Sequence, residues 1–487
     1  MPSHLTGLLL FMVFSSISHA LVTGPCYIGF DLGTSGARIS VVDHNGLSEI
    51  FSDSIRWEAY DDAIAWENAV FALLRRARSA MGTLESVRSI CVSGTSASCL
   101  LVNAQGDVTR TPRMYDYDVV ANEPIFGEQA LELLSKHAPL RHTTRAKTSS
   151  LAKLLTWALE RNLEDGEVLC HQSDYITMKL MSEKGAPRPL ISSDWHNCLK
   201  CGYDVKSLEW PDWMETCLEE AGIQDPFNKG VVPAIVVSPG QPLGVVSVRI
   251  ADEFGFSKDT LLVGGTTDSN AAFFAATGGV HAPLGTAVTS LGSTLAIKQL
   301  SRAYVEDASR GVYSHRFPNF HGDGSEMWLI GGASNVGCAV LRQQGFSDNE
   351  LVLLSKEIDP MSDIDLAYYP LVKKGERFPI ADGDKEPILE PVPDSRKDFL
   401  HGILQAISYV EKDGFLVLGK LGASPTRPTN VKTCGGGSKN EMWNSMRQRI
   451  LRSSCDNYDL SVDRAQNTEA SFGAAILASA TFIKNSV

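Results

Sequence analysis

The chain has few cysteines and few basic residues for its size, and it has no long apolar run. Its 487 residues include 10 cysteines, far below the density of a disulfide scaffold. Lys and Arg number 44 against 57 Asp and Glu, a formal net charge of −13. Nucleic acids and anionic membrane surfaces require clustered basic side chains, and a spanning helix needs about 20 apolar residues in a row. We therefore expect neither nucleic acid nor a membrane as a partner; a small polar substrate fits better.

Several catalytic motifs are also missing. The sequence contains no Walker A motif, no G-x-S-x-G elbow, no H-E-x-x-H helix and no Rossmann glycine motif with its acidic partner. Cys198 and Cys201 have C-x-x-C spacing beside His196, but no second pair completes the four ligands of a zinc site. These absences disfavour P-loop enzymes, α/β-hydrolases, zinc enzymes and dinucleotide-binding dehydrogenases.

The start of the chain differs in composition from the rest. The first 30 residues contain no Asp, Glu, Lys or Arg, and an apolar stretch from Leu8 to Phe14 is followed by a serine-bearing segment. The segment lacks the basic start of a secretory signal and the arginines of an organelle transit peptide. We interpret residues 1–25 as a leader or targeting segment.

The rest of the chain is typical of an α/β protein, in which strands and helices alternate. Residues 26–30 and 37–42 predict a strand hairpin around a glycine-rich turn, and 287–297 predict a second one. Length alone allows about three domains. The repeated design instead favours two, residues 26–275 and 276–487. In the second we predict a strand over 327–330, a Gly331-Gly332 turn after it, and a surface excursion over 373–393.

The first candidate motif is Asp31-Leu32-Gly33-Thr34-Ser35-Gly36-Ala37-Arg38, at the tip of the first hairpin. Glycines let the backbone approach an anion, hydroxyls and amides donate to phosphate oxygens, and an adjacent aspartate can hold a metal that neutralises them. The alternative is a plain glycine turn with a solvated aspartate.

The second motif is Asp268, where a predicted strand runs into an alanine-rich helix. An aspartate there can simply cap the helix. Alternatively, the helix N-terminus keeps the carboxylate ionised, and the carboxylate orients a substrate hydroxyl and accepts its proton during phosphoryl transfer.

Two further glycine turns complete the set, residues 290–294 and 433–440. Three successive glycines at a helix start give an anion and a flat ring access to bare backbone, with Asn440 as a polar contact. A flexible connector is the alternative for the glycine run.

In this order the segments resemble the FGGY family of carbohydrate kinases, over nearly all of the chain from Tyr27 to Ala480. The resemblance implies an α/β fold of two ribonuclease-H-like domains, as in the actin and hexokinase superfamily, around an ATP cleft. The first domain would hold the sugar and the second the nucleotide, with the final helix packing back on the first domain.

By this resemblance Asp268 is the general base that accepts the proton of the sugar hydroxyl. Asp31 would hold Mg²⁺ and help to seat the substrate, with ATP as co-substrate. The other substrate-side positions would be Thr34, Ser35, Gly36, Ala37, Arg38, Ser93 and Asp116. The positions around ATP would be Gly33, Thr34, Ser290, Gly292, Ser293, Gly331, Gly436, Gly437, Ser438, Lys439 and Asn440.

The presumed sugar pocket departs from that of xylulokinases. Residues 94–98 read Gly-Thr-Ser-Ala-Ser where xylulokinases usually have Gly-Gln-Met-His-Gly, and 114–118 replace a Trp-x-Asp-x-Arg pattern. The chain is most similar to the plant and cyanobacterial xylulokinase-like branch. That branch implies phosphorylation of D-ribulose to D-ribulose 5-phosphate, in the chloroplast or another plastid. The cytoplasm is the alternative compartment, and secretion conflicts with a need for ATP.

Two alternatives remain open on the sequence. One is a kinase for D-xylulose or another ketose or polyol. The other is a nucleotide-binding protein of the actin-like or pseudokinase type, whose sugar site has decayed. Sugar-dependent turnover separates the kinases from the second alternative.

Overall fold

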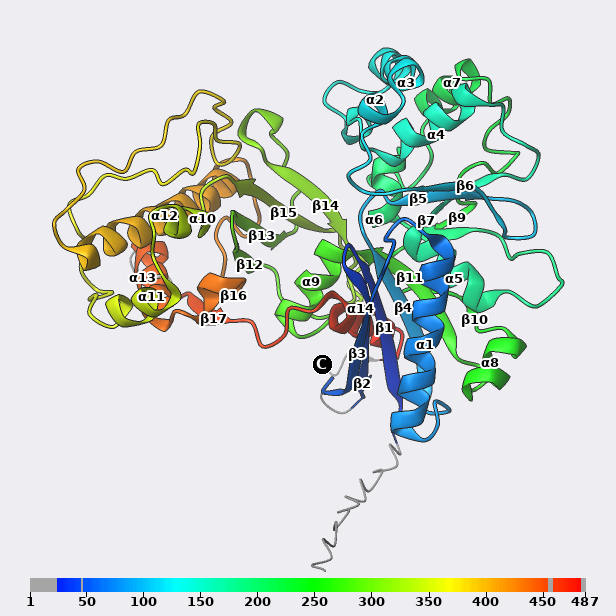
Figure 1. The fold of residues 1–487 in the computed structure, drawn as a ribbon, viewed down its shortest axis with the longest axis horizontal. Coiled ribbons are helices and arrows are strands. Elements are labelled where there is room, and N and C mark those ends of the chain that lie inside the picture. Colours follow the sequence, from blue (N-terminus) through cyan, green and yellow to red (C-terminus); the bar gives the residue numbers. More distant parts are fainter. Residues whose placement is uncertain (1–23, 45–46, 454–458, 483–487) are drawn as a thin grey trace, which may run out of the picture.

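The computed structural model describes residues 24–44, 47–453 and 459–482, which form two lobes (Figure 1). The expected leader therefore lies outside the described residues, except for Gly24 and Pro25. None of the helices in the described part of the chain combines the length and apolar character needed to cross a bilayer.

The first sheet begins with an antiparallel meander of β1 (Cys26–Gly33), β2 (Gly36–Asp43) and β3 (Glu49–Arg56). Two strands extend it in parallel from β1, namely β4 (Val87–Gly94) and β11 (Leu261–Thr267). With β10 (Pro242–Val245) at the edge, the order is β10-β11-β4-β1-β2-β3. The parallel strands are apolar and almost fully buried, as expected for strands covered on both faces.

Helices cover both faces of the first sheet. Side chains alternate along β1, so successive residues of this strand pack on opposite faces. Ile28 and Phe30 pack with α1 (Ala63–Met81), α5 (Gln172–Met181) and α8 (Val248–Phe254). Tyr27 packs on the opposite face with α9 (Asp268–Thr277) and α14 (Ala470–Ser479).

The last helix, α14, lies directly on the first sheet although it follows the second sheet in the chain (Figure 1). A Cβ atom at Gly29 of β1 would lie 2.0 Å from the carbonyl oxygen of Ser471. A Cβ atom at Gly473 would lie 1.8 Å from the carbonyl oxygen of Ala271 in α9. Only glycine permits this approach of β1, α14 and α9.

A large insertion between β4 and β11 forms the upper part of the right-hand lobe in Figure 1. Its strands are β5 (Cys99–Val102), β6 (Val108–Arg113), β7 (Val168–His171), β8 (Ser192–Asp194) and β9 (Ile235–Val237). Its helices are α2 (Val119–Asn122), α3 (Pro124–His137), η1 (Thr143–Arg145), α4 (Ser150–Glu160), α6 (Trp195–Cys198), η2 (Leu199–Cys201) and α7 (Asp212–Glu220). Buried residues of α3, α4, α7 and β5 give this part a hydrophobic core of its own.

The second sheet repeats the design of the first. Its meander is β12 (Thr286–Leu291), β13 (Leu295–Ser301) and β15 (Met327–Ser334), extended in parallel by β16 (Asn430–Cys434) and β17 (Ser461–Arg464). β14 (Tyr313–Phe317) adds the edge strand. The remaining helices are η3 (Ala308–Arg310), α10 (Ala339–Gln343), α11 (Asp348–Ser355), α12 (Arg396–Lys420), η4 (Gly436–Lys439) and α13 (Glu441–Arg452).

The two sheets share one strand order, a three-stranded meander followed by two parallel strands. This confirms the predicted α/β fold of two related domains. The boundary expected between residues 275 and 276 falls inside the last turn of α9, which ends at Thr277.

Two expectations for the second domain need correction. The predicted Gly331-Gly332 turn is wrong, because both residues lie inside β15, where Gly331 pairs with Lys298 of β13. A Cβ atom at Gly332 would lie 2.3 Å from the Phe378 ring. Phe378 belongs to the stretch 373–393, so this excursion is not confined to the surface: the Phe378 side chain is fully buried in the domain core.

Candidate active site

Three neighbouring strands bring Asp31, Arg38 and Ser93 together. In the register of the first sheet Asp31 lies opposite Arg38 of β2 and beside Ser93 of β4. The Ser93 hydroxyl donates to Oδ1 of Asp31 at 3.1 Å, and Nη1 of Arg38 donates to Oδ2 at 3.3 Å. Only 4% of Asp31 is exposed, so a buried carboxylate stands at the end of β1 with a defined direction.

Asp268 lies close enough to Asp31 for the two charges to interact. Burial raises the pKa of Asp31 to about 6, and the negative charge of Asp268 contributes to that shift. Asp268 is the first residue of α9, directly after β11, which lies beside β4 in the sheet. The topology therefore brings together two carboxylates that are more than 200 residues apart.

Asp268 is not the helix cap. The capping position belongs to Thr267, and Oδ1 of Asp268 accepts a hydrogen bond from the backbone N–H of Ser269 at 2.6 Å. The helix start thus supplies one hydrogen bond that favours the ionised carboxylate. Burial outweighs the Ser269 hydrogen bond and raises the pKa of Asp268 above its usual value. A carboxylate with a raised pKa is better matched to accepting a proton near neutral pH.

Two lysines that the sequence analysis did not single out face Asp268. Positive charge on Lys298 of β13 and on Lys200 of η2 lowers the pKa of Asp268, against the effect of burial. In return, the charge of Asp268 opposes the burial that lowers the pKa of both lysines. The only sequence signal for Lys298 is a cation within a strand otherwise rich in apolar residues.

The tip of the first hairpin divides into exposed and packed residues. Thr34 and Ser35 are exposed, so their hydroxyls can reach a ligand. Ala37 is fully buried in the core of the first domain, and a Cβ atom at Gly36 would lie 2.1 Å from the carbonyl oxygen of Ile55. The Ala37 side chain therefore faces the core, and Gly36 is required by packing against β3. Gly33 uses its carbonyl oxygen to accept from the Trp57 indole N–H at 2.9 Å.

The second hairpin and the glycine run lie side by side. Ser290 of β12 pairs with Cys434 of β16, and Gly435 follows with a φ of 82°. A Cβ atom at Gly435 would lie 2.6 Å from the carbonyl oxygen of Leu291. The backbone of Gly292 and Ser293 accepts hydrogen bonds from Cys338 and Ala339, at 2.9 and 3.2 Å. The two predicted glycine turns, residues 290–294 and 433–440, are thus neighbours in the second domain.

The residues of the glycine run have different environments. Gly436 is open, with no atom within 4 Å of a Cβ added there, whereas a Cβ atom at Gly437 would lie 2.7 Å from the Trp443 ring. The Asn440 side chain is used within the protein: it accepts from the Trp443 N–H at 3.1 Å and donates to the Ser355 hydroxyl at 2.8 Å. Asn440 therefore caps α13 and ties it to α11.

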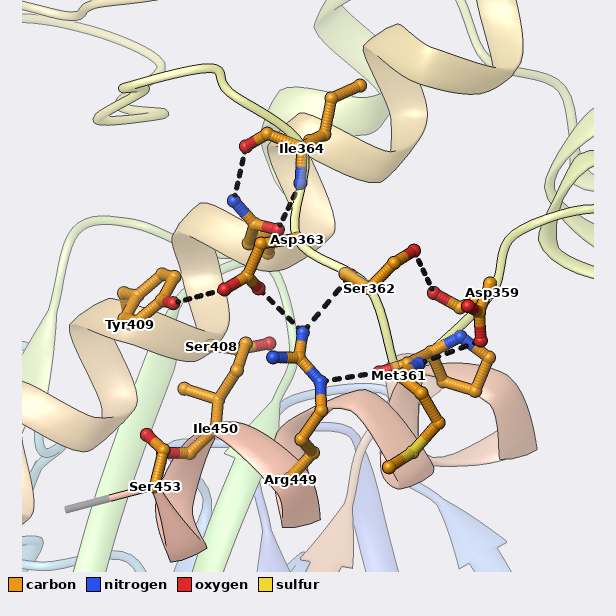
Figure 2. A network of polar contacts seen from close by, with 12 residues as sticks. Asp359, Met361, Ser362, Asp363, Ile364, Ser408, Tyr409, Arg449, Ile450 and Ser453 are labelled. Carbon is orange, nitrogen blue, oxygen red and sulfur yellow. Dashed lines mark hydrogen bonds and ion pairs between the residues drawn. The ribbon is translucent and has the colours of Figure 1, made fainter.

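A cavity of about 800 Å³ opens beside this run, lined by Ser438, Lys439 and one face of α13. Met361 forms part of the opposite wall. Figure 2 shows how this wall is held: Arg449 of α13 donates to the carbonyl oxygen of Pro360 at 2.7 Å and to Oδ1 of Asp363 at 2.7 Å. Oδ2 of Asp363 accepts from the Tyr409 hydroxyl at 3.2 Å, which joins the wall to α12.

Hydrogen bonds from buried residues hold the loop at residues 94–98. The Thr95 hydroxyl contacts Ser98 at 2.5 Å, and the Thr95 N–H donates to Gln172 at 3.1 Å. Nζ of Lys153, a buried residue of α4, donates to the carbonyl oxygens of Ala97 at 2.8 Å and Met114 at 2.6 Å. Ser96 is the one residue of the loop whose side chain is partly exposed.

Asp116 is placed differently from the other substrate-side residues. It is exposed and lines a cavity of about 770 Å³ together with Tyr60, Arg113 and Glu160. Asp31, Ser93 and Asp268 do not line that cavity. The structure thus brings Asp31, Arg38, Ser93 and Asp268 into one group and leaves Asp116 at a separate cavity.

Asp31 and Asp268 are carboxylates of the kind that would hold a magnesium ion bound to a nucleotide. Mg²⁺ in nucleotide enzymes is bound by one or two carboxylates together with phosphate oxygens and water. A carboxylate offers about four lone-pair sites, and the Ser93 and Arg38 hydrogen bonds use two of those on Asp31. A divalent cation held there would relieve the mutual repulsion of Asp31 and Asp268.

Known proteins resemble this chain in sequence at a low level. The xylulose kinase of Staphylococcus epidermidis is 22% identical over 477 residues, which cover 93% of this chain and 87% of that protein. The xylulose kinase of Escherichia coli is 22% identical over 452 residues, which cover 86% of this chain and 84% of that protein. No protein-family model matches the chain.

Solved structures of other proteins resemble the fold of this chain over almost its whole length. A glycerol kinase from Plasmodium falciparum with ADP has a TM-score of 0.73 at 14% identity, covering 94% of this chain and 89% of that one. A xylulose kinase from Bifidobacterium adolescentis has a TM-score of 0.72 at 18% identity, covering 94% and 92%. The chain has the two-domain fold of these sugar kinases, and the similarities in sequence support the carbohydrate kinases as its family.

Proposed function

We propose that this chain is a pentulose kinase that transfers the γ-phosphoryl group of ATP to D-ribulose and forms D-ribulose 5-phosphate. The observation that carries the proposal is the pairing of Asp31 with Asp268 at the end of the first sheet, where both carboxyl groups have a raised pKa. The similarity in sequence to xylulose kinases supports a sugar as the acceptor.

In the proposed reaction Asp268 accepts the proton of the attacking sugar hydroxyl while the hydroxyl oxygen forms a bond to the γ-phosphorus. The bond from that phosphorus to the bridging oxygen breaks, and ADP leaves. Asp31 would hold a magnesium ion bound to ATP, and that ion would neutralise charge on the phosphate oxygens. Phosphoryl transfer depends mainly on positioning and on charge neutralisation, and the chain supplies Arg38 and the exposed hydroxyls of Thr34 and Ser35 on the first hairpin.

The choice of D-ribulose follows from the resemblance to the plant and cyanobacterial xylulokinase-like branch and from the loop at residues 94–98, which departs from the usual xylulokinase sequence. Thr95, Ala97 and Ser98 are buried, so Ser96 alone among them presents a partly exposed polar side chain. D-xylulose fits the same carboxylates equally well, because the two ketoses differ only in the configuration at one carbon. The substrate must therefore be identified by measurement.

The decisive experiment couples ADP release to a panel of sugars. Purified protein with ATP and Mg²⁺ is assayed with D-ribulose, D-xylulose, L-ribulose, glycerol and no sugar. We expect the highest kcat/KM with D-ribulose. A higher kcat/KM with D-xylulose would make D-xylulose the substrate instead of D-ribulose. A rate of ADP release independent of every sugar would favour the actin-like or pseudokinase alternative.

Asp268→Asn is the matching variant, because it keeps the size of the side chain and its acceptor oxygen. Loss of a general base costs about 10²- to 10⁴-fold in rate, so sugar-dependent ADP release should fall by that factor while ADP binding stays near its original affinity. Asp252→Asn, at an exposed position of α8, is the control. Wild-type turnover in D268N would contradict the role of Asp268.

For the cellular location we propose a plastid. The support is the resemblance to the plant branch of xylulokinase-like kinases, together with the first 30 residues, which contain no acidic side chain. Residues 1–25 fused to a fluorescent protein should direct it to chloroplasts in plant cells, and uniform cytoplasmic fluorescence would contradict this.

A further inference from the structure

Lys200 of η2 is a half-buried cation that the protein itself does not bind. Within the described residues 24–44, 47–453 and 459–482, Nζ of Lys200 donates no hydrogen bond and forms no ion pair. Burial nevertheless lowers the pKa of Lys200, because the side chain has lost part of its contact with water. The ammonium group is therefore partly desolvated without an acceptor in return.

Two lysines nearby do have acceptors. Nζ of Lys153 donates to two carbonyl oxygens at 2.8 and 2.6 Å, and Nζ of Lys298 donates to the carbonyl oxygen of Ser269 at 2.9 Å. A polar group taken out of water without a partner is costly, and native proteins pair nearly all such groups. A structural role thus accounts for Lys153 and Lys298, and it does not account for the charge of Lys200.

The helical segment that carries Lys200 is fixed against the end of β11. α6 and η2 are continuous, because the residues that join them keep right-handed helical dihedral angles. His196 and Lys200 are four residues apart in this segment and share a face of it. Nδ1 of His196 lies 2.7 Å from Oγ1 of Thr266, two residues before Asp268. Lys200 therefore lies on the face that is turned towards the carboxyl end of β11.

Electrostatic interactions agree with this placement. The charge of Asp268 acts on Lys200, and the charge of Lys200 acts on Lys153. Lys153 in turn holds the loop at residues 94–98 through the carbonyl oxygen of Ala97. Lys200 thus lies between the base of the proposed reaction and the loop that is expected to contact the sugar.

An acceptor sugar has the chemistry that Lys200 lacks within the protein. The proposed function places this sugar between Asp268 and the loop at residues 94–98. An ammonium group has three donors and no acceptor, and a ketose has carbonyl and hydroxyl oxygens that accept hydrogen bonds. A bound ketose would therefore supply the missing partner.

We propose that Lys200 is a binding residue for the acceptor sugar, and that its ammonium group donates a hydrogen bond to an oxygen of the ketose. The proposal rests on the kinase function proposed above. It adds a charged donor from η2 to the carboxylates and hydroxyls that the first sheet provides.

The test compares Lys200→Met with the wild type at a single pH. Methionine keeps the length of the side chain and removes the donor. A hydrogen bond to a charged group contributes enough for its loss to raise the Kd and the KM of D-ribulose roughly 10- to 100-fold. KM for ATP should stay nearly unchanged. Isothermal titration without ATP gives the Kd, and the coupled assay of ADP release gives both KM values.

Lys258→Met is the matched control, because Lys258 is an exposed lysine of the same domain, just before β11. It should leave the Kd of D-ribulose as in the wild type. A wild-type Kd in K200M would overturn the proposal, as would an equal rise in K258M. A fall of kcat in K200M with an unchanged Kd and KM for D-ribulose would also overturn it, and would assign Lys200 to the phosphoryl group instead.

Thermal unfolding of the ligand-free proteins separates this role from a structural one. K200M removes an ammonium group that has no acceptor in the protein, so its Tm should not be lower than that of the wild type. A lower Tm together with an unchanged Kd for D-ribulose would give Lys200 a structural role and overturn the proposal.

A further measurement uses the wild-type protein without turnover. Brief labelling with acetic anhydride, read by mass spectrometry, gives the rate of acetylation of each lysine. Saturating D-ribulose should slow the acetylation of Lys200 several-fold and leave that of Lys258 unchanged. An unchanged rate at Lys200 would overturn the proposal.

The binding measurements also separate this proposal from the kinase function. Binding of D-ribulose without sugar-dependent ADP release would contradict the kinase function alone, and the Kd in K200M would still decide the role of Lys200. A wild-type protein that binds none of the sugars in the panel would overturn both.

Discussion

At the scale of single residues, Asp31 shows how a carboxyl group can be costly for stability and useful for chemistry. Its folded-state pKa of about 6 lies above the value of 3.8 for a free side chain. The folded protein therefore binds the proton more tightly than the unfolded chain does. Stability from this group is fully present below about pH 4 and is lost as the pH rises through about 6.

The first prediction follows from this sign. The shift corresponds to an upper limit of roughly 3 kcal/mol, so the free energy of unfolding should fall as the pH rises from about 4 to about 6. Asp31→Asn should flatten this slope, as measured by urea unfolding at a series of pH values. Part of the slope should remain, because burial also raises the pKa of Asp194 to about 6.

Asp259→Asn, at an exposed position before β11, is the control for that series. It should leave the slope as in the wild type. A slope in D31N that equals the wild-type slope would show that Asp31 does not bind its proton more tightly in the folded protein.

At the scale of elements, α4 holds the loop at residues 94–98 through one side chain. Ala97 has a φ of 67°, a left-handed conformation that is unfavourable for a residue with a Cβ atom. The Lys153 ammonium stabilises this conformation, because it donates hydrogen bonds to the carbonyl oxygens of both Ala97 and Met114. Since the same loop presents Ser96, we expect its conformation to set the affinity for the sugar.

Lys153→Met should therefore weaken sugar binding more than ATP binding. Two buried carbonyl oxygens lose their partner at about 1 to 3 kcal/mol each, so the free energy of unfolding should fall by about 2 to 6 kcal/mol. KM for the sugar should rise while KM for ATP stays nearly constant in steady-state assays. The surface variant Lys136→Met, which loses an exposed ion pair with Glu220, should change neither KM. Parallel rises of both KM values in K153M would contradict the assignment.

A second element-scale feature is a buried ion pair in the second domain. Arg447 of α13 and Glu411 of α12 are fully buried and joined by two hydrogen bonds of 2.7 Å. Thr289 of β12 donates to Glu411 at 2.6 Å, and Arg447 donates to Thr433 of β16 at 2.8 Å. The pair thus fixes α12 and α13 to the two strands that end at the second hairpin and the glycine run.

Removal of one partner leaves the other charge buried and unpaired. Arg447→Met should lower the free energy of unfolding by about 3 to 5 kcal/mol, measured by guanidinium denaturation, and the double variant with Glu411→Leu should regain part of it. Lys432→Ala, which breaks the exposed pair with Asp463, is the control, with an expected change below about 1 kcal/mol. A double variant less stable than R447M alone would contradict this account.

At the scale of the whole molecule, contacts between the domains gather at one junction. Nζ of Lys298 in β13 donates to the carbonyl oxygen of Ser269 in α9 at 2.9 Å. Nε2 of His196 donates to the carbonyl oxygen of Arg316 at 2.7 Å, and Nη1 of Arg316 donates to the carbonyl oxygen of Val205 at 2.8 Å. The last two contacts tie β14 of the second domain to α6 and its neighbours in the first. If the proposed kinase binds sugar and nucleotide on opposite sides of this junction, we expect the domains to close over the ligands by rotation about it.

Small-angle X-ray scattering tests this closure. The radius of gyration should decrease when D-ribulose and a non-hydrolysable ATP analogue are added together, and less with either alone. An unchanged radius at saturating concentrations of both ligands would contradict closure.

The success of sequence reasoning differs from feature to feature. The hairpins around residues 33–36 and 292–294 were predictable because hydrophobic spacing and glycine turns are local signals. Gly331 and Gly332 were misassigned to a turn, because a glycine pair inside a strand looks the same in sequence. Glycine is required at these two positions because Ile297 and Phe378, from distant segments, pack directly against them.

Local patterns of residues were thus enough to establish an acidic α/β protein with two related domains and an aspartate at a helix start. They could not supply the contacts among Asp31, Arg38, Ser93, Asp268 and Lys298, which come from five elements of two domains. Nor could they supply the raised pKa values, because burial and neighbouring charges exist only once these segments have packed together. Strand order and domain docking, rather than spacing along the chain, decide which of the polar residues share a site.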